Sequence, residues 1–230
     1  MMKISAKTLG ALGMPSFCPR CFWLQMHYRL PYQIFPGIFS TIDSYTKTLV
    51  HSYMDAHGSA PPWLSPLGAV KSYVKPPHYS SFQAREGDIT LQGEADGIFR
   101  MEDGSHIIVD YKTSKHTEAQ DDLYPIYHIQ LNAYAYIGER NGLKPVSALA
   151  LVYFEPMKDL EGLSLDAHIR DTGFVLPFRT KIVPVKVDAE ATIPALLHKA
   201  KAIYDEKEAP ECKEGCKDCE LMGKVVEGYN

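Results

Sequence analysis

Apolar and polar positions alternate most regularly near the middle of the chain. Residues 88–101 alternate as a β-strand does, residues 106–113 form a second apolar run, and an Asp-Gly turn separates the two. An Asp-Gly pair between two such runs is a strong signal for a β-hairpin. If paired residues have numbers that sum to about 206, Asp96 lies opposite Asp110, with the two side chains within about 5 Å of each other.

The remaining pattern predicts helices and strands in alternation. The predicted elements are helices at 43–57, at 118–140 and from about Pro194 onward, a strand at 146–154, and extended segments at 173–187. Pro125 lies early in the second helix, and Thr192 is the expected cap of the third. Residues 58–87 contain five prolines and are predicted to be a long surface connection. This order predicts one α/β domain over residues 1–230, with a sheet sandwiched by helices.

The composition is that of a soluble globular protein, with 45% hydrophobic and 23% charged residues in a chain of 230. No apolar run approaches the roughly 20 residues of a membrane helix, and no secretory signal is visible, so we expect a cytoplasmic protein without membrane contact. The net charge of −4 is unevenly distributed. Residues 1–42 carry four basic side chains and no carboxylate, whereas residues 203–230 form an acidic tail that could contact a protein partner.

Carboxylates and a lysine gather on the predicted hairpin. Asp110 and Lys112 are two residues apart on one strand and therefore project from one face, as Glu94 and Asp96 do on the other strand. Carboxylates as close as Asp96 and Asp110 repel each other unless a proton or cation lies between them, and Mg²⁺ favours such oxygen ligands. Lys112 could then orient an attacking water.

The helix that follows adds two polar side chains. Gln130 and Tyr134 are four residues apart, so they share one helix face and could hold a phosphodiester or a water over the carboxylates. The structural alternative is that Asp110 and Lys112 form a surface ion pair, while Gln130 and Tyr134 border a core.

Five cysteines lie only near the two ends of the chain. Cys18 and Cys21 form one CxxC pair, Cys216 and Cys219 form another, and Cys212 is a spare or an alternative fourth ligand. Four thiolates can hold zinc or an iron–sulfur cluster, and the spacing does not decide between them. Either metal would bring the two ends of the chain together.

The ordered set of site residues resembles the PD-(D/E)XK nuclease superfamily, in its RecB-type branch. The features that carry the resemblance are Asp96, the Asp110-Tyr111-Lys112 step and the Gln130-x3-Tyr134 helix. The resemblance implies a restriction-endonuclease-like fold, in which helices flank a central mixed β-sheet. It also implies a phosphodiesterase that depends on Mg²⁺ or Mn²⁺.

Roles for individual residues follow from the same resemblance. Asp96 and Asp110 would bind the metal, helped by the backbone carbonyl of Tyr111 and by His51 on the preceding helix. Lys112, Gln130 and Tyr134 would complete the catalytic set. The branch often has a glycine four residues before this histidine, and here that position is Lys47.

The cysteines resemble those of CRISPR-associated adaptation exonucleases in the same branch. There, one cysteine near the start of the chain and three near its end hold a [4Fe–4S] cluster, and Cys18, followed by Pro19 and Arg20, resembles the first of these ligands. This chain departs from that pattern by having Cys21 and a C-x3-C-x2-C tail. The two CxxC pairs make Cys18, Cys21, Cys216 and Cys219 the expected ligands, in a subdomain made of residues 1–35 and 205–230. The implied function is a DNA nuclease, most similar to a single-strand exonuclease. The alternative is a catalytically silent nucleic-acid-binding or assembly module with a structural zinc site.

Overall fold

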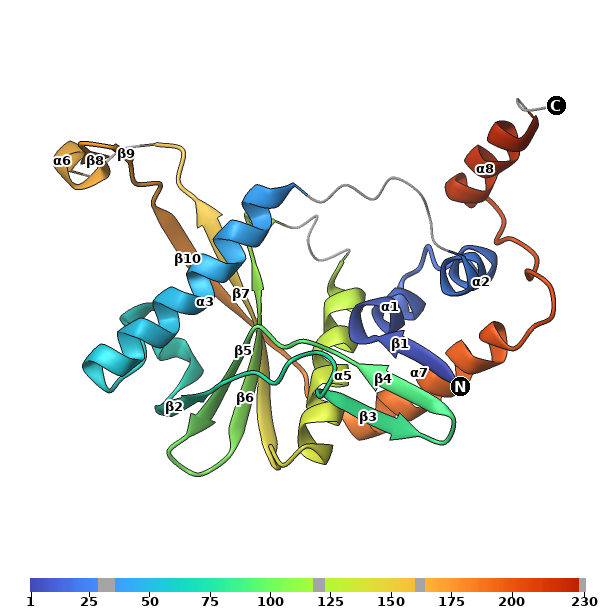
Figure 1. Ribbon diagram of the computed structural model, residues 1–230, viewed down its shortest axis with the longest axis horizontal. Coiled ribbons are helices and arrows are strands. Elements are labelled where there is room, and N and C mark those ends of the chain that lie inside the picture. Colours follow the sequence, from blue (N-terminus) through green and yellow to red (C-terminus); the bar gives the residue numbers. More distant parts are fainter. Residues whose placement is uncertain (29–35, 118–122, 160–163, 228–230) are drawn as a thin grey trace.

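The computed structural model of the protein describes residues 1–28, 36–117, 123–159 and 164–227, and its centre is a five-stranded mixed sheet (Figure 1). The strand order is β10-β7-β6-β5-β2, with β6 and β7 parallel and the other pairs antiparallel. The bounds are β2 Val70–Val74, β5 Gly97–Met101, β6 His106–Lys112, β7 Val146–Pro156 and β10 Phe178–Val185.

Alternation of side chains along the strands gives this sheet two apolar faces. One face, which includes Ile108 and Leu151, packs against α5 (Tyr124–Arg140) and α7 (Ala189–Tyr204). The other face, which includes Val109 and Val152, packs against Val50 of α3 (Gly37–His57) and the 3₁₀ helix η2 (Pro62–Leu67). Helices therefore flank a central mixed sheet, which confirms the predicted fold class.

A smaller sheet lies beside the main one. Its strand order is β1-β4-β3, with bounds β1 Met2–Ser5, β3 Gln83–Glu86 and β4 Ile89–Gln92. The short helices α1 (Ala6–Gly10) and η1 (Ala11–Gly13) follow β1 and pack against α5. The parallel pairing of β1 with β4 brings the start of the chain into the core.

Two further groups of elements extend from this body (Figure 1). The two cysteine-bearing segments lie on one side, with α2 (Pro19–His27) close to α7 and α8 (Lys217–Glu227). On the opposite side, α6 (Leu165–His168), β8 (Ile169–Arg170) and β9 (Gly173–Phe174) form an arm between β7 and β10. Among the described residues, no helix has the length and apolar character needed to cross a membrane.

The predicted hairpin register is confirmed, but its first strand is interrupted. Gly97 pairs with Val109 and Ile98 with Ile108, so the paired numbers sum to 206. The predicted strand 88–101 is two strands, β4 and β5, which belong to different sheets and are joined by residues 93–96. Glu94 and Asp96 therefore lie on the connection and not on a regular strand.

Other boundaries also differ from the predictions. Residues 58–87 contain η2, β2 and β3, and Leu64 and Phe82 are fully buried. The prolines do not prevent these elements, because three lie at or inside η2 and the other two lie between β2 and β3. The helix expected from Pro194 begins at Ala189, and Thr192 lies inside it, bonded to Asp188. It is followed by α8, which the pattern did not predict. The predicted helix start at 118–122 lies outside the described residues.

Candidate active site and cysteine centre

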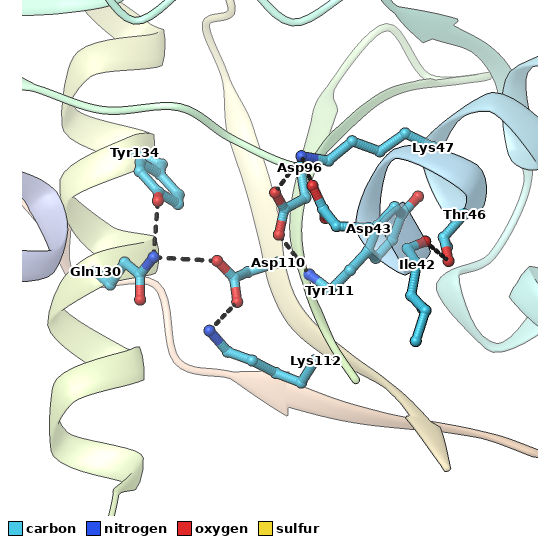
Figure 2. A network of polar contacts seen from close by, with 10 residues as sticks. All are labelled: Ile42, Asp43, Thr46, Lys47, Asp96, Asp110, Tyr111, Lys112, Gln130 and Tyr134. Atoms are coloured by element: carbon cyan, nitrogen blue, oxygen red, sulfur yellow. Dashed lines mark hydrogen bonds and ion pairs between the residues drawn. The ribbon is translucent and has the colours of Figure 1, made fainter. Parts of the chain in front are cut away.

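The hairpin and α5 bring the predicted site residues together on the sheet (Figure 2). Asp110 and Lys112 lie at the end of β6, and their spacing of two places both side chains on the sheet face that α5 covers. Gln130 and Tyr134 lie one turn apart on α5. Asp96 directly precedes β5, whose first pair is Gly97 with Val109, so one further step of the same register places Asp96 opposite Asp110.

Asp110 is the most enclosed carboxylate of the group, with 4% of its surface exposed. Its Oδ1 accepts a hydrogen bond from Gln130 Nε2 at 3.1 Å, and Gln130 also donates to the hydroxyl of Tyr134 at 2.7 Å. Its Oδ2 lies 2.5 Å from Lys112 Nζ, and the Lys112 ammonium lies 4.2 Å from the centre of the Tyr127 ring. The carboxylate is therefore oriented by α5 on one side and by its own strand on the other.

Asp96 is held by the backbone of β6 and by a lysine of α3. Its Oδ2 accepts the backbone N–H of Tyr111 at 2.8 Å, and its Oδ1 lies 2.8 Å from Lys47 Nζ. The same ammonium lies 2.8 Å from Oδ2 of Asp43, one turn earlier on α3. Lys47 thus joins two carboxylates that are far apart in the sequence (Figure 2).

Burial and mutual repulsion make this pair of aspartates a poor place for two negative charges. Burial, followed by the charge of Asp110, raises the pKa of Asp96 to about 6, although Lys47 opposes the shift. Burial also raises the pKa of Asp110, against the attraction of Lys112. Two close carboxylates in a dry setting are the donor set that a hard divalent cation such as Mg²⁺ or Mn²⁺ requires. The residues present therefore fit such an ion.

His51 lies on α3 beside the same carboxylate. It lines a cavity of about 410 Å³ together with Lys47, Glu94 and Asp96. Its ring stacks on Tyr73 with the centroids 4.1 Å apart, and burial lowers its pKa, which favours the neutral imidazole. Among the described residues, His51 does not form a group with Asp96 and Asp110 in which the ligand atoms lie within 4.8 Å of one another, so its role as a metal ligand stays a prediction.

Tyr111 has a structural role in the site in addition to the predicted role of its backbone carbonyl as a metal ligand. Its backbone N–H fixes Asp96, while its buried ring packs on the opposite sheet face, edge-on to Phe154 at 5.4 Å. The predicted ligand role of its carbonyl stays a prediction.

Sequence reasoning missed the part played by Asp43 and Lys47. The resemblance identifies Lys47 only as the residue in the glycine position, and it assigns no role to Asp43. Asp43, Lys47 and His51 follow one another at intervals of four, which places them on one face of a helix. That spacing was the available signal, but it does not reveal which strand the face meets.

The four predicted cysteine ligands converge at the second site. One ligand atom from each of Cys18, Cys21, Cys216 and Cys219 lies within 4.8 Å of the others. Cys18 Sγ is 3.7 Å from Cys219 Sγ, and Cys21 Sγ is 3.6 Å from Cys216 Sγ and 3.4 Å from Cys219 Sγ. The donor set fits a thiophilic metal, and the clustering of the two chain ends is confirmed.

Local structure explains why these sulfurs meet. Cys18 caps α2 and Cys21 lies in its first turn, while Cys216 immediately precedes α8 and Cys219 lies in its first turn. Although burial opposes it, hydrogen bonds from the backbone of Cys21 and Lys213 lower the pKa of Cys18 to about 6. Cys212 is exposed and is not one of the four.

The fold and the site together define a class of protein. A mixed sheet that carries Asp-x-Lys on one strand, a second aspartate opposite it and a Gln-x3-Tyr helix above is the arrangement of a metal-dependent nuclease domain. The family model of the PD-(D/E)XK nuclease superfamily matches residues 60–223. The chain belongs to this superfamily, whose chemistry indicates a nucleic-acid substrate.

Solved structures and curated proteins provide two further comparisons. The solved structure titled "Crystal structure of SSO0001" shares 15% sequence identity, with a TM-score of 0.42 over 90% of this chain and 78% of that chain. No curated protein matched the chain. His51 and the first CxxC pair lie before the residues that the family model matches.

Proposed function

We propose that the protein is a Mg²⁺- or Mn²⁺-dependent deoxyribonuclease that acts as an exonuclease on single-stranded DNA. One observation carries the proposal: Asp110, buried on the sheet, is joined by direct contacts to both Lys112 and Gln130, with Asp96 opposite it. A structural ion pair needs neither a second buried carboxylate nor a glutamine to orient the first. The preference for single strands and for ends rests on the resemblance to RecB-type exonucleases.

The residues of the site have separate tasks in this reaction. A bound divalent ion supplies a Lewis acid for the scissile phosphate and stabilises the leaving oxygen. Asp96 and Asp110, with His51 and the Tyr111 carbonyl, would hold it. Lys112, whose ammonium faces Asp110, would orient the attacking water and balance charge that develops on the phosphate.

Gln130 and Tyr134 keep the carboxylate of Asp110 in position. Because Gln130 Nε2 donates both to Asp110 and to the Tyr134 hydroxyl, rotation of the carboxylate would break this chain of contacts. Burial, together with the charge of Asp110, raises the pKa of Tyr134, so its hydroxyl stays protonated. It therefore remains a donor to substrate or water.

A second cavity beside the site supports a nucleic-acid substrate. It measures about 400 Å³ and begins at Thr113, the residue after Lys112. Its lining includes the cations Lys115, Lys158 and Arg179 and the carboxylates Glu155 and Asp159, and Lys115 pairs with Glu155 at 3.5 Å. Neither Lys158 nor Arg179 forms an ion pair with another described residue. Cations in a groove next to the reacting group are suited to the phosphates of a strand that leaves the site.

The first test is cleavage of labelled DNA by the wild-type protein and by Asp110→Asn. We expect Mn²⁺-dependent release of nucleotides from single-stranded DNA and a loss of about a thousandfold or more in the variant, since a metal ligand is removed. Asp166→Asn, which changes an exposed aspartate of the arm, is the matched control and keeps full activity.

The thermal midpoint of unfolding, measured without added Mg²⁺ or Mn²⁺, separates a catalytic role from a structural one. Asp110 is too buried to reach water, whereas Lys112 is one-fifth exposed and can turn toward it. We therefore expect Asp110→Asn to have the same thermal midpoint as the wild type or a higher one. No cleavage by a folded wild-type protein with its cysteine centre loaded would favour the silent binding module, and cleavage of RNA alone would exclude a deoxyribonuclease.

For the cysteine centre we propose a single zinc ion. The resemblance implies a [4Fe–4S] cluster, in which each thiolate binds a different iron atom and the four sulfurs are spread around the cluster. Around one Zn²⁺ with Zn–S bonds of about 2.3 Å, tetrahedral sulfurs lie about 3.8 Å apart. The separations of 3.4, 3.6 and 3.7 Å support the single ion.

A further inference from the structure

Lys47 forms an ion pair where the proposed metal would need an oxygen ligand. Oδ2 of Asp96 already accepts the backbone N–H of Tyr111 and has one lone pair left, whereas Oδ1 has two lone pairs to offer a cation. Lys47 Nζ lies 2.8 Å from that oxygen. A divalent ion bound through Asp96 Oδ1 would meet the ammonium group at contact distance, and two cations cannot share that place.

We propose that Lys47 is an internal cation that competes with the divalent metal ion for Asp96, so that metal binding requires the lysine to move. This inference rests on the proposed function, because it assumes that Asp96 is a metal ligand. It assigns to Lys47 a role in setting metal affinity.

The surroundings of Lys47 allow the movement. Its ammonium has a second partner in Asp43, at 2.8 Å on the same helix face, and the Asp43 side chain is 41% exposed against 16% for Asp96. Lys47 can therefore leave Asp96 while it keeps Asp43. The cavity of about 410 Å³ that both Lys47 and Asp96 line gives the flexible side chain room to turn.

The ion pair between Lys47 and Asp96 balances charge in the metal-free protein. Asp96 and Asp110 lie opposite each other, and each has its own lysine, Lys47 for one and Lys112 for the other. The two ammonium groups offset a repulsion that would otherwise act against folding. The consequence is weaker metal binding, because the ion pair between Lys47 and Asp96 must be broken before the metal ion binds Asp96.

The test measures Mn²⁺ binding directly, by calorimetry and by the electron paramagnetic resonance of free Mn²⁺, without substrate. Lys47→Met removes the charge and keeps the length of the side chain, and we expect it to bind Mn²⁺ about tenfold more tightly or better. Lys47→Arg keeps the charge and does not gain affinity. Thermal midpoints without added divalent metal show that both variants are folded.

The chain offers a matched control for the loss of a bridging lysine. Lys201 also contacts two carboxylates, Asp88 and Asp205, and its side chain is 21% exposed against 24% for Lys47. Lys201→Met changes the net charge by the same amount and leaves Mn²⁺ affinity as in the wild type.

The outcomes separate the two proposals. If the wild type and Lys47→Met bind Mn²⁺ with equal affinity, the inference is overturned while the nuclease proposal stands. The same holds if Lys201→Met gains as much Mn²⁺ affinity as Lys47→Met does. Absence of Mn²⁺ binding to all of these folded proteins overturns both. Selective tightening in Lys47→Met supports the competition even if the substrate proves to be different.

Discussion

At the scale of single residues, the site is a set of charges held where water cannot fully solvate them. Asp110 is 4% exposed and Asp96 is mostly buried, so each negative charge depends on a nearby donor. Lys112, Gln130, Lys47 and the Tyr111 N–H supply these donors. A site of this kind is stable only while its charges balance, which makes it sensitive to protons and to metal ions.

Asp96 should give the metal-free protein an unusual dependence on pH. Its pKa in the folded protein is about 6, above the ordinary 3.8, because of burial and the charge of Asp110. The folded state therefore binds the proton more tightly than the unfolded state. The stability from this group is fully present below about pH 4 and is lost as the pH rises through about 6.

The measurement compares thermal midpoints of the wild type and Asp96→Asn without added divalent metal between about pH 4 and 7. We expect the midpoint of the wild type, relative to the variant, to fall as the pH rises. The comparison with the variant is needed because other carboxyls, such as Asp88 and Glu190, have lowered pKa values and act in the opposite direction. A difference that stays constant or grows with pH would contradict the prediction.

At the scale of elements, α5 connects the small sheet to the chemistry. Its Tyr134 ring packs beside Gly93, on the connection between β4 and β5, and its hydroxyl accepts a hydrogen bond from Gln130. A Cβ atom at position 93 would lie 2.7 Å from two carbons of the Tyr134 ring. The glycine therefore allows the connection that carries Asp96 to approach the helix that orients Asp110.

Gly93→Ala should disturb the active site through the ring of Tyr134. The added methyl group forces the Tyr134 ring to move, which costs about 1–3 kcal/mol of stability and shifts Gln130 away from Asp110. We expect kcat to fall, with a smaller change in KM, in cleavage assays well below the thermal midpoint.

Gly37→Ala is the matched control, because it lies in α3 with nothing within 4 Å of the new Cβ. It should keep full activity, and because Gly37 is the first residue of α3, its stability should change by less than the about 1 kcal/mol of an interior helix position. Equal kcat for Gly93→Ala and the wild type would exclude this coupling.

The element boundaries show which parts of the fold the sequence pattern predicts and which it does not. The hairpin register was predictable, because the Asp-Gly turn and the alternation of β6 fix which residues face each other. The break at residues 93–96 was not, since β4 and β5 both alternate and only their different partner strands separate them. Likewise, the prolines of 58–87 hid strands that are stabilised by pairing with β4 and β5.

At the scale of the whole molecule, the cysteine centre joins the two ends of the chain. Cys18 and Cys219 are 201 positions apart and their sulfurs are in contact. The indole N–H of Trp23, on α2, also donates to the backbone carbonyl of Glu206 at 3.0 Å. Such a closure removes freedom from the unfolded chain, as a long-range cross-link does.

Loss of one ligand should therefore destabilise the entire domain. Cys216→Ser is expected to release the metal and to lower the thermal midpoint by about 10 °C or more. Cys212→Ser, which changes an exposed cysteine outside the four, keeps both metal content and midpoint.

Metal analysis of the wild type, purified without oxygen, tests the identity of the ion. One zinc per chain and no visible absorbance would support the single-ion centre. Four irons with acid-labile sulfide would show the iron–sulfur cluster instead.

The sequence by itself determined the structural features that depend on residues close together along the chain. Turn chemistry and alternation placed Asp96 opposite Asp110, and helical spacing placed Gln130 and Tyr134 on one face. Residue type restricted the cysteines to a few metals. The tertiary structure alone decided that Lys47 reaches Asp96 and that Cys212 stays outside the cluster. Those contacts depend on how α3, α8 and the sheet pack, which follows from long-range burial and not from any local pattern.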